Sequence, residues 1–343
     1  MVHIAIVGCG VIGITSGMAI QNRIKGAKVT IFTEKVSPNT TTDLAGGLWE
    51  PYLVGDTPPK KVAKWGRITY DYLLDLWKSG KAGEAGISLQ PVTTATDEEG
   101  FQKPDWLEYT LGYSELSEEK LAALSKRYKT KLTWGVTFTN FLWEGMTMLP
   151  FLQKEFIENK GDIIMKKISN LEELSGYDVV LNCTGLGSQE LIDDPDIKPI
   201  RGQIMKVNAP WVFHSYLMVT EKCGYVLSNK SFTTLGGTRQ VDDYNTNVNE
   251  DDKEYIWRNC SELLPSIKSA EVIEHQVGLR PARNKVRLEA EIKRTPTGDL
   301  KIVHNYGHGG AGITLSVGCA AEAAELVEKL LKGNSEVSDQ IYF

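Results

Sequence analysis

The sequence opens on a short apolar run that breaks into a regular glycine pattern. His3–Val7 is rich in β-branched residues, and Gly8, Gly10 and Gly13 follow with the spacing G-x-G-x-x-G. This order predicts a strand, a tight turn and a helix. Gly8 would permit the turn, Gly10 would let a phosphate approach the backbone, and Gly13 would let helix and strand pack closely. A phosphate group would then bind the free amides at the helix N-terminus.

The residues after this turn favour a dinucleotide site over a turn with a purely structural role. Val29–Phe32 reads as a second strand, and Glu34 follows it directly. An acidic residue roughly 20 positions beyond the glycines is where a ribose hydroxyl is usually bound. A structural glycine turn without a ligand remains the alternative at this point.

Length and charge narrow the class of protein further. With 343 residues the chain can hold two domains, since a domain usually takes ~100–200 residues. The net charge of −6 and the lack of a long basic block give no reason to expect nucleic acid as a partner. No apolar run approaches the ~18 residues of a membrane helix, and the early first strand leaves no room for a signal peptide. We therefore expect neither nucleic acid nor membrane as a partner.

The cysteine pattern points to an intracellular location. The five cysteines are widely scattered, without the C-x-x-C spacing of a structural zinc site, and no metal is expected. Reduced thiols fit a cytoplasmic or peroxisomal protein, although the final residues, Gln340–Phe343, match no recognisable peroxisomal tripeptide.

The remaining pattern predicts an interleaved α/β fold. Hydrophobic periodicity predicts helices over 61–77, 116–124, 148–159, 252–264 and from Gly312 to Leu331, and strands over 87–95, 136–141, 162–168 and 178–182. Closely spaced strand-like runs at 202–207, 215–219, 225–227 and 232–236 indicate an antiparallel sheet. We expect a nucleotide-binding Rossmann-type domain from residues 1–50, 145–190 and 270–343. A substrate domain on a mixed, largely antiparallel sheet would comprise 51–144 and 191–269.

Seven stretches together resemble one family, the FAD-dependent D-amino-acid oxidases. They occur in the family's order and span nearly the whole chain: Gly8–Gly13, Thr40–Tyr52, Val180–Gly187, Arg201–Ile204, Leu235–Gln240, Gly278–Pro281 and His304–Thr314. The resemblance implies an FAD domain and a second domain whose sheet roofs the flavin. It also implies hydride transfer from the amino-acid Cα to flavin N5, after which O2 yields hydrogen peroxide and the imine hydrolyses to a 2-oxo acid and ammonia. A homo-oligomer is left open.

The resemblance assigns the cofactor-binding residues position by position. The phosphate turn, the ribose end, the segment along the cofactor, the adenosine half and the loop beside the isoalloxazine would be formed by Gly8, Cys9, Gly10, Val11, Ile12, Gly13, Glu34, Lys35, Thr41, Thr42, Gly46, Gly47, Leu48, Ile168, Thr184, Gly309, Gly312, Ile313 and Thr314. Gly310 would lie on the substrate side of that last loop. The helix after Gly312 could stabilise negative charge on the reduced flavin through its N-terminus.

Arg280 is the first candidate for substrate binding. It stands in the apolar frame Val277–Pro281, and its planar guanidinium can bind a carboxylate through two hydrogen bonds. A structural ion pair is the alternative. The resemblance places the family's carboxylate-binding arginine here and matches Tyr225 to a tyrosine that meets the same carboxylate. No convincing general base stands in these motifs, and His304 and His308 read as structural.

Arg239 suggests which D-amino acids react. D-aspartate oxidases resemble this segment with an arginine there, whereas oxidases of neutral D-amino acids lack it, so we expect D-aspartate, with D-glutamate weaker. Glu50 could pair with Arg239 or repel an acidic substrate, which keeps neutral D-amino acids as the alternative. Tyr52 stands where some D-aspartate oxidases have histidine, and the lid region 220–228 looks short. An FAD-bearing binding protein without turnover and an NAD-dependent dehydrogenase are the rivals from other classes.

Overall fold

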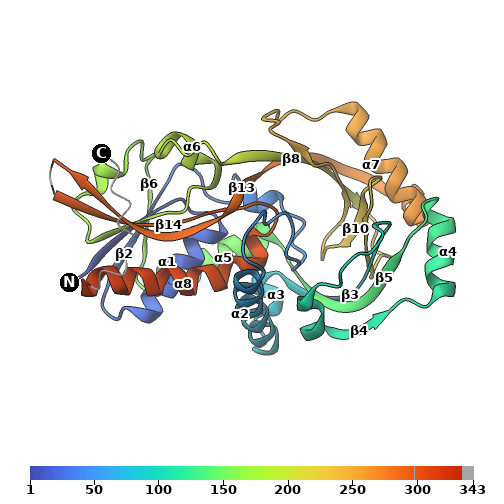
Figure 1. The fold of residues 1–343 in the computed structure, drawn as a ribbon, viewed down its shortest axis with the longest axis horizontal. Helices are drawn as coiled ribbons and strands as arrows, with labels where there is room; N and C mark the ends of the chain where they lie inside the picture. The colour runs from blue at the N-terminus through green and yellow to red at the C-terminus, as the bar shows by residue number, and fades with distance from the viewer. Residues whose placement is uncertain (297, 334–343) are drawn as a thin grey trace.

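The computed structural model describes residues 1–296 and 298–333. One mixed sheet extends from one end of this structure to the other. Figure 1 shows an elongated molecule with helices gathered around both ends of that sheet. The predicted α/β class with a large mixed sheet is confirmed.

A parallel end of the sheet follows from the opening glycine pattern. Its strands are β1 (His3–Val7), β2 (Lys28–Thr33), β6 (Asp162–Met165) and β7 (Val179–Asn182), in the order β7-β1-β2-β6. In β1, Ile4 and Ile6 join the main core, whereas Ala5 and Val7 join a second core with Ile168. Because both faces are covered, the strand is a continuous apolar run rather than an alternating one. The helices α1 (Val11–Arg23), α5 (Gly145–Glu158) and α8 (Gly312–Lys332) pack together at this end (Figure 1).

The other end of the sheet is mostly antiparallel, as the closely spaced runs indicated. The strands β8 (Lys198–Asn208), β9 (Ser215–Val219), β10 (Gly224–Ser228) and β11 (Thr233–Gly236) pair in the order β9-β10-β11-β8, and β12 (Gln240–Val241) also pairs with β8. Next to β9, in parallel, runs β3 (Ile87–Thr96), followed by β5 (Trp134–Trp143) and β4 (Leu111–Glu115). The helices α4 (Glu118–Tyr128) and α7 (Glu250–Leu263) lie at this end (Figure 1).

A single long strand joins the two ends. β13 (Glu271–Thr295) has 25 residues and pairs with β8 over residues 271–282 and with β14 (Gly298–His308) over residues 282–295. Its pairing shifts register between Ala282 and Arg287, where it changes partner. β14 in turn pairs in parallel with β7. The sequence analysis did not predict this strand, because its second half is strongly charged and Pro281 interrupts it.

The expected helices are present, with ends that differ by a few residues. Ser117 caps α4, accepting a hydrogen bond from the Lys120 amide at 3.3 Å. The strand expected over 162–168 was predicted too long: it ends at Met165, after which Lys166–Ile168 leave the sheet. The other helices are α2 (Pro59–Lys78), α3 (Ala82–Ala85) and α6 (Ser188–Leu191).

The two-domain division stays a prediction, since the sheet runs across the predicted boundaries without a break. Within residues 1–296 and 298–333, no helix combines the length and apolar character needed to cross a bilayer. The C-terminal residues Gln340–Phe343 lie outside the described residues.

The contact between α2 and α8 yields a test of this packing. A Cβ added at Gly318 would lie 2.2 Å from the Trp65 carbonyl oxygen, whereas one added at Gly83 in α3 would meet nothing within 4 Å. We expect Gly318→Ala to lower the free energy of unfolding by about 2 kcal/mol or more, because two buried backbones must separate. Gly83→Ala should leave it unchanged or raise it by about 0.5 kcal/mol. Urea unfolding of both variants checks the pair, and equal effects would contradict the packing described.

Candidate active site

A cavity of about 660 Å³ runs along the carboxyl ends of the parallel strands and reaches the antiparallel end of the sheet. Residues after β1, β2, β6 and β7 line one part of it, and residues of β10 and β13 line another. In open α/β sheets, ligands bind at this edge, outside the carboxyl ends of the strands. The cavity is therefore where the sequence analysis places a dinucleotide and a substrate.

The first glycine turn forms one wall of the cavity. Gly8 has φ +104°, and a Cβ there would lie 2.5 Å from the Cys183 carbonyl oxygen. A Cβ on Gly13 would lie 1.9 Å from the Gly8 carbonyl oxygen, so the start of α1 rests directly on the turn. No side chain of the N-cap residue covers this helix end, and Thr42 Oγ1 accepts a hydrogen bond from the Val11 amide at 3.2 Å.

A second helix N-terminus faces the same cavity. Ala311 gives α8 no side-chain cap, and Gly312, Ile313 and Thr314 in its first turn all line the cavity. Thr314 Oγ1 donates a hydrogen bond to the Glu50 carbonyl oxygen at 2.9 Å and accepts one from the Glu50 amide at 3.1 Å. The start of α8 and the segment around residue 50 are thus fixed side by side.

Arg280 and Tyr225 reach the cavity because glycines on neighbouring strands make room for them. A Cβ on Gly202 in β8 would lie 2.3 Å from Nη1 of Arg280, which donates a hydrogen bond to the Thr238 carbonyl oxygen at 3.2 Å. Tyr225 stands opposite Gly236 in the β10–β11 pairing, and a Cβ on Gly236 would lie 2.0 Å from its ring. Both side chains lie flat over bare backbone, which fixes their orientation.

Two arginines, Arg239 and Arg280, bring positive charge to this part of the cavity. Among the described residues, no carboxylate forms an ion pair with Arg239 or Arg280. Arg239 follows β11 and is exposed, while Arg280 is half-buried. Burial raises the pKa of Tyr225 to about 12, although Arg280 opposes this. It also raises the pKa of Tyr52, against the effect of both arginines. Both phenols are neutral at pH 7.

The region predicted as a short lid is a four-residue turn, 220–223, between β9 and β10. Helix α7 holds it from behind: the Lys222 carbonyl oxygen accepts hydrogen bonds from the Tyr255 hydroxyl and, at 2.6 Å, from Asn259 Nδ2. Cys223, at the end of the turn, lines the cavity. The turn is therefore a fixed wall of the site.

Comparison with known proteins agrees with this geometry. The model of the FAD dependent oxidoreductase family matches residues 3–326. A D-aspartate oxidase of Homo sapiens is 36% identical over 333 residues, covering 95% of each chain. A D-amino acid oxidase of Dugesia ryukyuensis is 36% identical over 336 residues, covering 96% of this chain and 98% of that one.

The chain belongs to the FAD-dependent oxidoreductase family. Its resemblance to D-amino-acid oxidases is confirmed, and both curated relatives above carry oxidase names. Among solved structures, glycine oxidase from Geobacillus kaustophilus has the same fold, with a TM-score of 0.75 at 16% identity over 96% of this chain and 95% of that one. The protein is thus an enzyme, an oxidoreductase, with FAD as its cofactor.

The cavity of the oxidoreductase fits FAD in charge and in polar groups. Two helix N-termini whose N-cap residues form no side-chain hydrogen bond face it, which suits the negative diphosphate at one and a reduced flavin at the other. Asn305 and His308 line the cavity and are buried, and Asn305 Oδ1 and His308 Nε2 have no partner within the protein. Buried polar atoms of this kind need a hydrogen-bonding ligand, which a flavin nucleotide offers.

Almost every residue that the sequence analysis named for the site lines this one cavity. They are Gly8, Cys9, Gly10, Val11, Ile12, Glu34, Lys35, Thr41, Thr42, Gly46, Gly47, Leu48, Ile168, Thr184, Tyr225, Arg239, Arg280, Gly309, Gly310, Gly312, Ile313 and Thr314. Gly13 alone stands behind the wall, against Gly8. The analysis missed Cys223, Gly202 and Gly236; the two glycines stand in stretches that it compared with the family, whereas no sequence signal marks Cys223.

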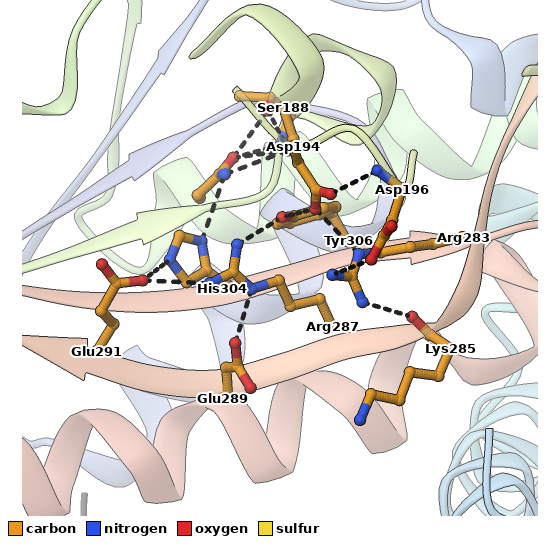
Figure 2. Close-up of polar contacts among 12 residues, drawn as sticks. Ser188, Asp194, Asp196, Arg283, Lys285, Arg287, Glu289, Glu291, His304 and Tyr306 are labelled. Atoms are coloured by element: carbon orange, nitrogen blue, oxygen red, sulfur yellow. Dashed lines mark hydrogen bonds and ion pairs between the residues drawn. The ribbon is translucent and has the colours of Figure 1, made fainter. Parts of the chain in front are cut away.

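A buried polar network supports the wall that contains Thr184. Figure 2 shows it crossing from Ser188 to Glu291. Thr184 Oγ1 donates to Asn182 Oδ1 at 2.8 Å, Asn182 Nδ2 lies 3.5 Å from His304 Nδ1, and His304 Nε2 lies 3.0 Å from Glu291 Oε2. Both ring nitrogens of His304 therefore take part in contacts within this network.

The second half of the network fixes the place where β13 changes partner. Asp194 accepts hydrogen bonds from the Tyr306 hydroxyl and, at 2.9 Å, from Arg283 Nε, while Arg287 Nη1 donates to the Tyr306 hydroxyl at 2.9 Å (Figure 2). Burial alone would raise the pKa of Asp194, but the hydrogen bonds from Tyr306, the Asp196 amide and Arg283 outweigh it and lower the pKa.

This network predicts a pH-dependent stability. Asp194→Ala should lower the free energy of unfolding by about 3 kcal/mol at pH 7, because it leaves Tyr306 and the buried side of Arg283 without the carboxylate. Since folding lowers the pKa of Asp194, its contribution is full above the ordinary value of 3.8 and is lost as the pH falls below it. Urea unfolding from pH 3 to pH 7 checks both statements. Asp193→Asn, at the exposed neighbouring position, is the control; an equal effect there would contradict the prediction.

Proposed function

We propose that this enzyme oxidises D-amino acids with two carboxylates, D-aspartate first and D-glutamate less well. The single observation that supports this is the pair of arginines, Arg239 and Arg280, that line one cavity without a carboxylate partner among the described residues. Bound FAD would supply the acceptor for a hydride from the substrate Cα, and its reoxidation by dioxygen would release hydrogen peroxide. The imine hydrolyses to a 2-oxo acid and ammonia.

We assign the α-carboxylate to Arg280 and Tyr225. The guanidinium offers two parallel N–H groups to a carboxylate, and the Tyr225 hydroxyl can donate a third hydrogen bond because its raised pKa keeps it protonated. Both groups are held over glycine backbone, so they orient the Cα–H bond of a substrate instead of following its movements.

The second carboxylate would bind Arg239. In the free enzyme Arg239 is exposed, so water compensates its charge. A bound substrate that covered it without a counter-charge would remove that water at a cost of several kcal/mol, whereas a side-chain carboxylate replaces it. The size of this difference makes Arg239 the main determinant of specificity in the proposed reaction.

Neutral D-amino acids are the second candidate, and Glu50 is the observation in their favour. It lines the same cavity, and the two relatives with different names are equally similar to the chain. Of the two roles considered for Glu50, a pairing with Arg239 is absent: no ion pair joins them in residues 1–296 and 298–333. Arg239 is thus left available for a substrate.

We also propose which residues bind the cofactor, where the cofactor domain lies and in which compartment the enzyme is found. The residues lining the cavity along the strand ends would bind FAD in the roles given by the resemblance, with residues 1–50, 145–190 and 270–343 as the cofactor domain. The five cysteines are all free, which supports a reducing compartment, cytoplasmic or peroxisomal.

Arg239→Leu tests the acidic substrate. We expect kcat/KM for D-aspartate to fall at least 100-fold, because the second carboxylate loses its cation, while kcat/KM for D-alanine changes less than about threefold. Peroxide release, measured over a panel of D-amino acids, provides both numbers. Arg258→Leu, which removes an arginine of α7 outside the cavity, is the matched control. Unchanged D-aspartate turnover in Arg239→Leu would refute the proposal.

A further inference from the structure

Glu50 is a carboxyl group in the substrate cavity that the proposed reaction leaves unused. Leu48, Glu50 and Tyr52 all line the cavity, whereas Trp49 between them is fully buried in the core. This alternation shows an extended segment with one face toward the cavity. The backbone of Glu50 is held on both its amide and its carbonyl by Thr314. The position of Glu50 is therefore as fixed as that of α8 itself.

The carboxylate of Glu50 has no cationic partner among the described residues. No ion pair includes it, and burial is the sole effect that moves its pKa, which rises to about 7. The arginines influence Tyr52 and Cys223 but not Glu50. Near neutral pH, Glu50 thus changes between a protonated and an ionised form, and no cation among the described residues pairs with the ionised form.

The other titratable groups around the substrate end do not change charge in this range. Burial raises the pKa of Tyr52, of Cys223 and, to about 12, of Tyr225, so these groups stay neutral at pH 7. Burial lowers the pKa of His308 to about 3, which leaves it neutral as well. The further charged residues of the cavity follow β2, β6 and β7, at the end assigned to the ribose and adenosine: Glu34, Lys35, Lys166, Lys167 and Glu190. Arg239, Arg280 and Glu50 are the remaining charged residues that line the cavity.

The net charge of these three groups would match one class of substrate when Glu50 is protonated and another class when Glu50 is ionised. With Glu50 neutral, two guanidiniums face the two carboxylates of an acidic D-amino acid. With Glu50 ionised, the net charge falls by one and suits a substrate with a single carboxylate. An ionised Glu50 would also repel the second carboxylate of an acidic substrate, because the cavity that the two groups would share screens charge poorly.

We propose that the protonation of Glu50 selects the substrate class: the neutral carboxyl admits D-amino acids with two carboxylates, and the carboxylate favours those with one. This inference rests on the proposed binding of the second carboxylate by Arg239. It makes Glu50 a specificity-determining residue that acts by charge, and it explains how a chain equally similar to both kinds of oxidase could serve both substrate classes.

The sign of the pH effect follows from linkage. A substrate with two carboxylates favours the protonated form of Glu50. Acidic substrates therefore bind best below the pKa of Glu50 and lose affinity as the pH rises through it. D-Asparagine has nearly the shape of D-aspartate and one carboxylate fewer. The ratio of kcat/KM for D-aspartate to that for D-asparagine therefore removes effects of pH that the two substrates share.

The experiment measures this ratio from pH 5.5 to pH 8 with the holoenzyme, wild type and Glu50→Gln. In the wild type we expect the ratio to fall at least about fivefold with a midpoint near 7, because ionised Glu50 repels the side-chain carboxylate that D-aspartate has and D-asparagine lacks. In Glu50→Gln the ratio should stay flat. Binding of succinate and of its monoamide, followed by the change in the flavin absorbance, should show the same contrast without turnover.

Each outcome bears on one proposal. A ratio with the same pH dependence in wild type and Glu50→Gln overturns the role of Glu50. So does a variant that loses activity equally for both substrates, since that result would make Glu50 a proton acceptor for the substrate ammonium. Failure of the acidic-substrate proposal is recognised separately, by a D-aspartate preference that survives Arg239→Leu at every pH. Glu119→Gln, at an exposed position of α4 outside the cavity, is the matched control and should retain the wild-type dependence.

Discussion

Strand β13 holds the two ends of this molecule together, and the site depends on the point where it changes partner. Its first half is hydrogen-bonded to β8 and its second half to β14, so the antiparallel and parallel parts share one backbone. Arg280 stands two residues before Ala282, where the change begins. The Gly309 amide donates to the Pro281 carbonyl oxygen at 2.8 Å, which places the loop before α8 directly beside this stretch. In the proposed reaction, main-chain pairing would thereby bring a substrate held by Arg280 close to the loop before α8.

Local patterns sufficed to predict the parallel end from the sequence. The glycine turn, the buried strands and α8 each carry their signal within about 20 residues. The resemblance to a family named most of the cofactor residues, all of which except Gly13 line one cavity. The resemblance to a family placed Arg280, Tyr225 and Arg239. By contrast, β13 was missed because charged residues and Pro281 mask its periodicity. The space for Tyr225 and Arg280 depends on strand register, as in the pairing of Tyr225 with Gly236, and register is a non-local property.

Stability and function are separated in this structure by where charges are compensated. Behind the cavity, Asp194, Arg283 and Arg287 meet partners at hydrogen-bonding distance, and the network is largely closed. Inside the cavity, Arg239, Arg280 and Glu50 have no charged partner among the described residues. Groups that a protein leaves without partners in a cavity cost stability, and binding of a complementary ligand recovers that cost.

The turn between β9 and β10 has a consequence for substrate size. Its main-chain carbonyl at Lys222 is held by Tyr255 and Asn259 of α7, and its last residue, Cys223, forms part of the cavity surface. A wall anchored in this way acts as a stop of fixed position, so an additional methylene group in a substrate side chain has to be absorbed by bending of that side chain. In the proposed reaction, the length of the substrate side chain would then be limited by the space between Arg280, which would bind the α-carboxylate, and this turn.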